Sequence, residues 1–260
     1  MNGWFVLLLV WLVSAAIMLA GWQWQRRRRN AGIVDVLWAA SLGGAAVLLA
    51  VLGDGAVAPR TLLGALGGAW GMRLASHLWQ RVRREAEDGR YRALRSHWHD
   101  DQRRWFAFFQ LQALSVAIFA LPFLAVAVDR SPSACWLTVG CGVWLLGVLG
   151  ESLADAQLAR FRADPSTRGR TCRAGLWRYC RHPNYLFEWL HWFAYMALAV
   201  GSPLWILSWL GPLLMFLFLR FVSGIPWTEA QALRTRGEDY REYQRTTPML
   251  FPWFPRRPRS

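Results

Sequence analysis

A polar, Arg-rich turn runs directly into a hydrophobic helix at residues 175–188, GLWRYCRHPNYLFE, and this segment has the clearest potential to bind a ligand. Pro183 suits the first turn of a helix, because the N–H that proline lacks has no helical partner there. Helix N-termini favour anions, and Arg178, Arg181 and His182 would add positive charge from the side. The segment therefore predicts an anion site at the start of a helix.

Ionisable side chains inside apolar segments are costly, which makes them better functional candidates than charges in loops. Arg73 and His77 lie four residues apart on one helical face, and Asp155 and Arg162 lie seven apart on another. The full set of such candidates is Asp35, Arg73, His77, Asp155, Arg162 and Glu188. The alternative interpretation is a set of ion pairs that only hold helices together.

Apolar segments of the length that spans a bilayer make up most of this chain of 260 residues, 55% of which are hydrophobic. The pattern predicts an all-α integral membrane protein that forms a single membrane domain over residues 1–260. Seven spans are expected, and six is the alternative count, because only the turn Gly201-Ser202-Pro203 divides the last two. The seven are residues 3–22, 33–53, 61–79, 105–128, 134–153, 184–201 and 203–223.

The thirty basic residues are all Arg and give a formal net charge of +14. They gather in alternate connections between spans, at residues 26–29, 81–104 and 160–181, and in the C-terminal tail. This alternation indicates membrane topology, with the N-terminus outside and the basic segments and the C-terminus in the cytoplasm, and no nucleic-acid partner is expected. Because Arg binds phosphate in a bidentate manner, the same segments suit a phosphorylated cofactor or a lipid surface.

No metal site is predicted. The four cysteines form no CxxC pair. The run HWHDD at residues 97–101 has ligand chemistry but lies in a highly charged loop. Glu188 and His191 form an ExxH pair, but the second pair that carboxylate di-iron proteins need is missing from the sequence.

Several segments together resemble the bacterial branch of the steroid 5-alpha-reductase family. They are GLWRYCRHPNYLFE with DAQLARFR before it and GEDYREYQRTTPMLFPWFP after it, and also IVDVLW and WGMRLASHLWQRVRREAEDGRYRAL. The resemblance covers nearly the whole chain and implies seven transmembrane helices in the bacterial inner membrane. It implies an NADPH-dependent reductase that saturates the C=C bond of a lipophilic enone, typically the 4-ene of a 3-oxo steroid.

The resemblance also implies which residues bind the cofactor and which part of the chain binds the substrate. Residues 1–104 are expected to bind the substrate and residues 105–260 mainly the cofactor. The animal members of the family have Tyr in place of His77 and Asn in place of Glu151. The implied NADPH-binding residues are Arg73, His77, Arg84, Asp155, Arg162, Arg170, Tyr179, Asn184, Glu188, Glu229, Tyr240 and Tyr243.

Enone reduction needs a hydrogen-bond donor for the carbonyl oxygen, on which negative charge develops. A carboxyl group in an apolar pocket stays protonated and can donate this bond, and Asp35 is the acid expected to do so, away from the cytoplasmic phosphates. In the family an acid and a Tyr hold the substrate ketone. Trp70 stands at the Tyr position and can donate but not relay a proton. We expect Asp35 and Trp70 to be catalytic, and Trp38 to join them in contacting a substrate that enters from the bilayer.

Two other classes of function stay open. The RHPNY stretch is shared with isoprenylcysteine and phospholipid methyltransferases, which use S-adenosylmethionine. That cofactor has no phosphate to occupy so many Arg residues, and the paired acids expected after the last span are missing from this sequence. The third class is a membrane scaffold or transporter whose buried charges are structural.

Overall fold

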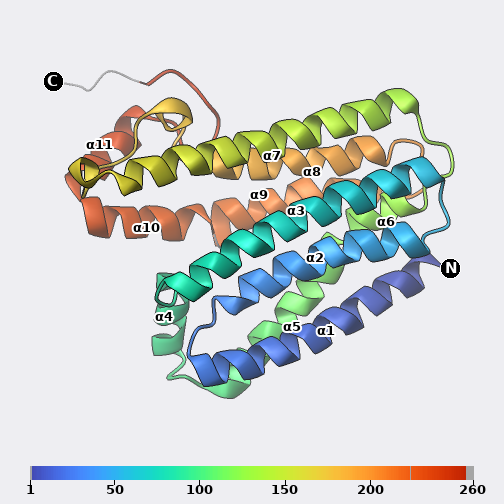
Figure 1. Cartoon of the computed structure of the whole chain (residues 1–260), viewed down its shortest axis with the longest axis horizontal. Coiled ribbons are helices and arrows are strands. Elements are labelled where there is room, and N and C mark those ends of the chain that lie inside the picture. The colour runs from blue at the N-terminus through green and yellow to red at the C-terminus, as the bar shows by residue number, and fades with distance from the viewer. Residues whose placement is uncertain (1, 223, 256–260) are drawn as a thin grey trace. The chain divides into compact units, whose positions relative to one another are not determined.

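The computed structural model describes residues 2–222 and 224–255. The described chain is all-helical, with 79% of residues in helices and no strand, which confirms the predicted all-α class. Figure 1 shows the helices in chain order. They are α1 Gly3–Arg28, α2 Ile33–Leu52, α3 Val57–Arg84, α4 Gly89–His97, α5 Gln102–Phe119, α6 Leu121–Ala127, α7 Ala134–Ala163, α8 Pro183–Leu198, α9 Leu210–Leu217, α10 Ile225–Arg236 and α11 Glu238–Thr246.

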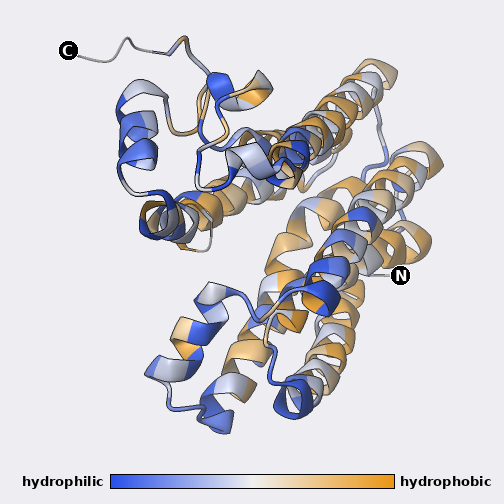
Figure 2. Ribbon diagram, turned by 60° about the vertical axis from the view of Figure 1, so that its left-hand side comes forward, coloured by the Kyte–Doolittle hydropathy of each residue, from blue (hydrophilic) through white to orange (hydrophobic). Residues whose placement is uncertain are grey.

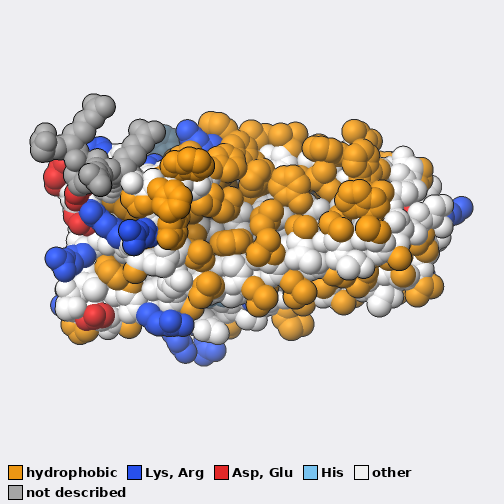
Figure 3. Space-filling model, turned by 90° about the horizontal axis from the view of Figure 1, so that it is seen from above, with side chains coloured by type: hydrophobic (Ala, Val, Ile, Leu, Met, Phe, Trp, Pro, Cys, Tyr) orange, Lys and Arg blue, Asp and Glu red, His pale blue; other side chains and the backbone are white. Residues whose placement is uncertain are grey.

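Five helical stretches within the described residues are long and apolar enough to cross a bilayer: Gly3–Arg28, Ile33–Leu52, Gln102–Ala127, Ala134–Ala163 and Trp205–Arg236. The protein is therefore an integral membrane protein. Figure 2 shows hydrophobic residues along these helices and hydrophilic ones at helix ends and in short connecting helices. On the face drawn in Figure 3, hydrophobic side chains cover a broad area and Arg side chains gather toward one end.

The predicted third and sixth spans are helical but do not satisfy the same criterion. The third is α3, whose apolar stretch is interrupted by polar residues such as Arg73 and His77. The sixth is α8, which has 16 residues, whereas each of the five stretches has at least 18. The helices at these positions are thus present, while the count of seven spans stays a prediction.

The chain forms two compact units, Met1–Cys141 with Tyr195–Gly211, and Gly142–Ala194 with Pro212–Ser260. The boundaries fall inside α7, α8 and α9. Consequently α5 and α6, which lie in the part of the sequence expected to bind mainly the cofactor, belong to the first unit with α1 to α4.

Close contact between α2 and α3 organises the first unit. A Cβ atom on Gly71 would lie 2.5 Å from the Cα of Gly43 and 2.9 Å from the carbonyl oxygen of Ala39. A Cβ on Gly67 would lie 2.5 Å from the Cβ of Ala46. Small residues let the two backbones approach, which favours packing between membrane helices.

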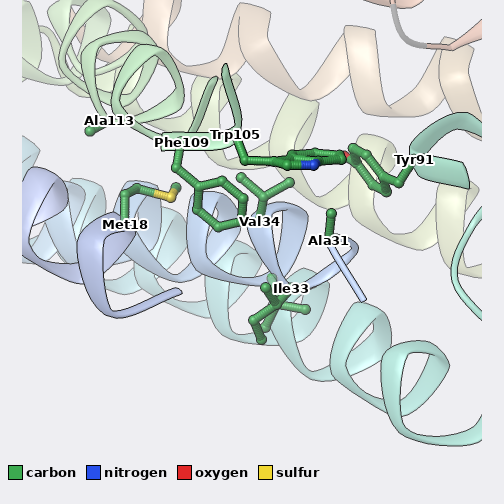
Figure 4. Close-up of a cluster of buried hydrophobic side chains, with 9 residues drawn as sticks. Met18, Ala31, Ile33, Val34, Tyr91, Trp105, Phe109 and Ala113 are labelled. Carbon is green, nitrogen blue, oxygen red and sulfur yellow. The ribbon is translucent and has the colours of Figure 1, made fainter. Parts of the chain in front are cut away.

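An aromatic cluster joins α1, α2, α4 and α5 at the end of the first unit where α2 begins. Figure 4 shows Trp105 and Phe109 of α5 beside Val34 of α2 and Tyr91 of α4, with Met18 of α1 at the edge. Trp105, Phe109 and Met18 are fully buried. The short helix α4 is thereby fixed against the start of α2.

In the second unit, α7 and α8 pack through glycines. A Cβ on Gly147 would lie 2.6 Å from the Cβ of His191, and one on Gly150 would lie 2.3 Å from the ring of Phe187. The indole N–H of Trp189 donates to the carbonyl oxygen of Pro212, 2.9 Å away, and so links α8 to the start of α9.

The contact of α2 with α3 gives a prediction about stability. Gly71→Ala should lower the free energy of unfolding by about 1–3 kcal/mol, because the added methyl group meets backbone atoms that cannot move aside. Thermal unfolding of the purified protein in detergent measures the effect.

Gly44→Ala is the matched control, because no atom lies within 4 Å of its Cβ position. The control should leave the unfolding temperature unchanged or raise it, since Ala favours a helix over Gly by roughly 0.5–1 kcal/mol. Equal unfolding temperatures for the two variants would contradict the proposed close contact.

Candidate functional site

The loop before α8 is fastened to α7 by side chains of α7. The backbone N–H of Leu176 donates to Gln157 Oε1 at 2.9 Å, and the indole N–H of Trp177 donates to the carbonyl oxygen of Ala154 at 2.9 Å. Gly175 has a φ of +58°, and a Cβ there would lie 2.5 Å from the Gln157 amide. A glycine is needed at this position for both reasons. The loop therefore delivers the start of α8 to a defined place on α7.

Two predicted cofactor residues meet where α7 and α8 come together. The amide Nδ2 of Asn184 donates to Asp155 Oδ1 at 3.2 Å, and the Asn184 Oδ1 accepts from the backbone N–H of Tyr185 at 3.0 Å. Asn184 is thus held by both ends of its amide.

Several positive charges near this point stay exposed. Arg162 near the end of α7 and Arg170 in the following loop are both exposed, and so is Tyr179, with 39% of its surface accessible. A nearby arginine behaves differently. Arg173 donates to Asp239 Oδ1 at 3.1 Å and to Glu242 Oε2 at 3.0 Å. Arg162 and Arg170 are therefore among the guanidinium groups that stay accessible to an anionic ligand.

Arg181 and His182 do not present their charge at an open helix start, and this corrects the sequence-based expectation. Arg181 Nε donates to Glu229 Oε1 at 2.7 Å, and the ring Nε2 of His182 lies 3.0 Å from the same oxygen. Arg181 also donates to the carbonyl oxygens of Gln244 and Thr247. The two side chains are 11% and 2% exposed, so they need these partners inside the protein. Burial also lowers the pKa of His182, although Glu229 opposes the shift, so the neutral imidazole is favoured.

Three of the predicted cofactor residues belong to this internal network. Glu229 accepts from Gln244 Nε2 at 2.8 Å in addition to Arg181 and His182. The hydroxyl of Tyr243 donates to the carbonyl oxygen of Trp177, and Tyr240 packs against the ring of Tyr243 with centroids 5.8 Å apart. Burial raises the pKa of both tyrosines, so both keep their protons. These residues hold α10 and α11 against the loop before α8, and their contact with a cofactor stays a prediction.

Glu188 is buried on α8, one turn beyond Asn184. Its Oε1 accepts from the indole N–H of Trp192 at 3.4 Å, and its backbone carbonyl oxygen lies 2.6 Å from His191 Nδ1. Glu151 of α7 is buried as well, with 7% of its surface exposed. The glycine contacts that bring α7 and α8 together place these acids in the interior of the second unit.

The predicted cofactor residues of α3 lie in the first unit. Arg73 is half-buried, whereas His77 and Arg84 are exposed. The spacings of four and seven residues place all three along one side of the helix. The other predicted cofactor residues, from Asp155 onward, belong to the second unit.

Asp35 has partners that its sequence position did not indicate. Arg90 Nη2 donates to Asp35 Oδ2 at 3.0 Å, and the hydroxyl of Tyr91 donates to Asp35 Oδ1 at 2.7 Å. The expected apolar pocket around this carboxyl is therefore corrected: a guanidinium and a phenol hold Asp35. The physical reason is that α4, which lies inside the basic segment 81–104, folds back onto the start of α2.

Tyr91 is the residue near Asp35 that sequence analysis did not single out. It is 6% exposed, and burial followed by the negative charge of Asp35 raises its pKa despite the opposing charge of Arg90. Tyr91 therefore keeps its proton and is a hydrogen-bond donor. The signal in the sequence was an aromatic residue inside the charged run DGRYRAL, where apolar surface needs burial.

The structure brings Trp38 and Trp70 together. Their ring centroids are 6.5 Å apart, and the Trp38 ring also contacts Phe119 at 5.3 Å. The indole N–H of Trp38 donates to Ser115 Oγ at 2.9 Å, while Trp70 is fully buried. Asp35 lies one turn before Trp38 and lines a separate small cavity of about 30 Å³, together with Asn30.

One comparison with known proteins gives a match. A family model described as a protein of unknown function (DUF1295) matches residues 21–247. No curated protein and no solved structure matches the chain.

The Arg181 network gives a second prediction about stability. Arg181→Ala should lower the free energy of unfolding by about 3–5 kcal/mol, because it leaves the buried Glu229 carboxylate without its guanidinium. Thermal unfolding in detergent is again the measurement.

Arg178→Ala removes an exposed guanidinium three residues earlier and serves as the control. Its unfolding temperature should match that of the unmodified protein. An unchanged unfolding temperature for Arg181→Ala as well would contradict the ion pair between Arg181 and Glu229.

Proposed function

The chain belongs to the DUF1295 family of proteins of unknown function, and on that premise we propose that it is an NADPH-dependent reductase of the steroid 5-alpha-reductase type. Its substrate is a lipophilic enone, most simply a 3-oxo-4-ene steroid, whose C=C bond receives the hydride. The observation that carries the proposal is the hydrogen bond between Asp155 and Asn184, with the exposed Arg162 two helical turns beyond Asp155 on α7. All three positions are among those that the resemblance assigns to the cofactor.

The proposal includes a membrane topology of seven spans. The N-terminus is outside, and the C-terminus and the Arg-rich connections face the cytoplasm, which in a bacterium lies inside the inner membrane. α3 and α8 are the two added spans. Some polar groups of α8 pair within the helix, as the contact of Glu188 with Trp192 illustrates, and such pairing lowers the cost of polar residues in a bilayer.

The chemistry of the second unit fits a dinucleotide phosphate. Arg162 and Arg170 offer planar guanidinium groups suited to bidentate phosphate binding. Asp155 and Asn184 offer acceptors and donors suited to ribose hydroxyls or a carboxamide. NADPH supplies the hydride when it is bound. S-adenosylmethionine, the cofactor of the methyltransferase alternative, has no phosphate to meet these arginines.

We propose that the substrate carbonyl binds in the first unit near Asp35 and Tyr91. The phenol O–H, which donates to Asp35 in the protein alone, turns to the carbonyl oxygen, while Arg90 keeps its ion pair with Asp35 and its guanidinium stays over the Tyr91 ring. The small cavity that Asp35 lines has room for one water-sized group. The half-buried Trp38 provides apolar surface for the carbon skeleton, and the fully buried Trp70 packs against its ring.

The cofactor assignment predicts the effect of two substitutions on NADPH binding. Arg162→Ala and Asn184→Ala should each weaken NADPH affinity by roughly tenfold, the loss expected for one charged or well-oriented hydrogen bond. Isothermal titration calorimetry on the full-length protein in detergent measures this.

Arg241→Ala, which removes a guanidinium that pairs with Glu238 on the exposed side of α11, should leave the affinity unchanged. Unaltered binding in both test variants would rule out this cofactor site. Binding of S-adenosylmethionine without any binding of NADPH would favour a methyltransferase.

The carbonyl assignment predicts a separate effect on catalysis. Tyr91→Phe keeps the ring in the aromatic cluster but removes the donor, so kcat for an enone should fall roughly 10²–10³-fold. NADPH affinity should not change. Steady-state kinetics with calorimetry on the same preparation separates the two effects.

Asp35→Asn keeps the shape of the side chain but weakens its bond to Arg90. It should lower kcat and should lower the free energy of unfolding only slightly. The opposite result is expected if the contacts of Asp35 with Arg90 and Tyr91 only hold α4 against α2. In that case both variants would unfold at lower temperature and retain full kcat below it.

A further inference from the structure

A cleft opens at the end of the first unit where α1 begins, far along the helices from Asp35. Its volume is about 490 Å³, within the range of small-ligand sites. α1 begins, α2 ends and α3 begins at this end of the unit, near the N label in Figure 1. The lining includes Trp4, Asp54, Leu124, Arg130, Gly201 and Leu204.

Backbone contacts make the walls of this cleft firm. The N–H of Gly55 donates to the carbonyl oxygen of Ala127 at 3.0 Å, and the N–H of Ala56 donates to that of Asp129 at 2.6 Å. Gly201 has a φ of +112°, and a Cβ there would lie 2.3 Å from the carbonyl oxygen of Ser131. The loops after α2, after α6 and after α8 are therefore locked together around a space that exists without a ligand.

The rim of the cleft carries one charge of each sign. Arg130 Nη2 lies 2.6 Å from Asp54 Oδ2, and the hydrogen bond from Arg130 lowers the pKa of Asp54, which is therefore ionised. The two side chains are 71% and 41% exposed. Exposed ion pairs contribute little to stability, so this one can open at little cost to accept a ligand with complementary charges.

A third carboxyl group lies behind the wall. Asp129 is fully buried; its Oδ1 accepts from the N–H of Ser131 at 2.9 Å, while its Oδ2 has no hydrogen-bond partner among the described residues. The Oδ1 lies 3.1 Å from the position that a Cβ of Gly201 would occupy, directly behind a residue that lines the cleft. The polar side of the cleft thus favours a cationic group near Asp54.

The position of the cleft makes the bilayer the source of its ligand. The apolar stretches Gly3–Arg28 and Ile33–Leu52 respectively begin and end here, so the cleft lies at the level where hydrocarbon gives way to headgroups. Trp4, Leu124 and Leu204 line it with apolar surface, while Arg130 and Asp54 line it with charge. This combination matches an amphiphile with a short charged head and an apolar tail.

We propose that this cleft binds the headgroup of a zwitterionic phospholipid that carries a primary ammonium. The phosphate binds Arg130 and the ammonium binds Asp54, so the lipid replaces the internal ion pair with two intermolecular ones. An anionic glycerol headgroup would leave Asp54 without a cation. A quaternary ammonium lacks the N–H groups that donate to a carboxylate.

Native mass spectrometry of the full-length protein in detergent tests the proposal. The protein is titrated with palmitoyl-oleoyl phosphatidylethanolamine, phosphatidylcholine or phosphatidylglycerol, and retained lipid is counted. We expect phosphatidylethanolamine to be retained roughly tenfold more strongly than either of the others, the difference made by one charged hydrogen bond. Equal retention of all three, or preference for phosphatidylglycerol, would overturn the proposal.

Substitutions distinguish a lipid site from a clamp between two loops. Arg130→Ala should lose the preference, and so should the double variant Asp54→Arg with Arg130→Asp. The double variant keeps an ion pair within the protein but exchanges the positions of its positive and negative charges. The lipid cannot reverse in the same way, because its phosphate always lies nearer to its acyl chains than its ammonium does. Its unfolding temperature should therefore equal that of the unmodified protein while its lipid preference disappears.

Arg103→Ala is the control, because Arg103 is exposed on α5 at the end of the unit away from the cleft. It should retain the full preference for phosphatidylethanolamine. A double variant that keeps the preference would show that Arg130 and Asp54 only join the loops, and the proposal would fail.

Discussion

A hydrocarbon environment offers no partner to a charged side chain, so every ion near the apolar helices must be satisfied within the protein. Glu229 meets this need for the second unit. It accepts hydrogen bonds from Arg181 and Gln244 and lies 3.0 Å from the ring nitrogen of His182, while Arg181 also reaches the carbonyl oxygens of Gln244 and Thr247. One carboxylate thereby joins the start of α8 to α10 and α11. The position of Asn184, three residues after Arg181, depends on it.

The first unit follows the same rule with different residues. Asp35 pairs with Arg90 and Tyr91, and Arg95 donates to Glu87, whose Oε1 also accepts the backbone N–H of Ala31. These contacts fasten the short helix α4 across the start of α2. The aromatic cluster packed against α4 excludes water, which strengthens these hydrogen bonds.

Long apolar segments could be recognised from the sequence because their signal is local. The expected span 33–53 corresponds to α2 at Ile33–Leu52, and 134–153 lies within α7 at Ala134–Ala163. The short helices α4, α10 and α11 lie in Arg-rich segments without such a signal. The partner of each charged residue could not be predicted from the sequence either, because Asp35 and Arg90 are 55 residues apart and Arg181 and Glu229 are 48 apart. A sequence shows that a charge needs a partner but not which distant residue supplies it.

The pairing of charges changes which part of the RHPNY segment is suited to a ligand. Arg181 and His182 are the most distinctive residues of the motif, yet they are used within the protein, and a buried arginine with its acceptors in place gains little by exchanging them for a phosphate. Asn184 is held beside Asp155, and Arg162 and Arg170 stay exposed at the end of α7 and in the loop after it. An exposed guanidinium is free to adopt the geometry that a phosphate requires. The motif itself fixes where α8 begins, because its arginine and histidine are held by Glu229.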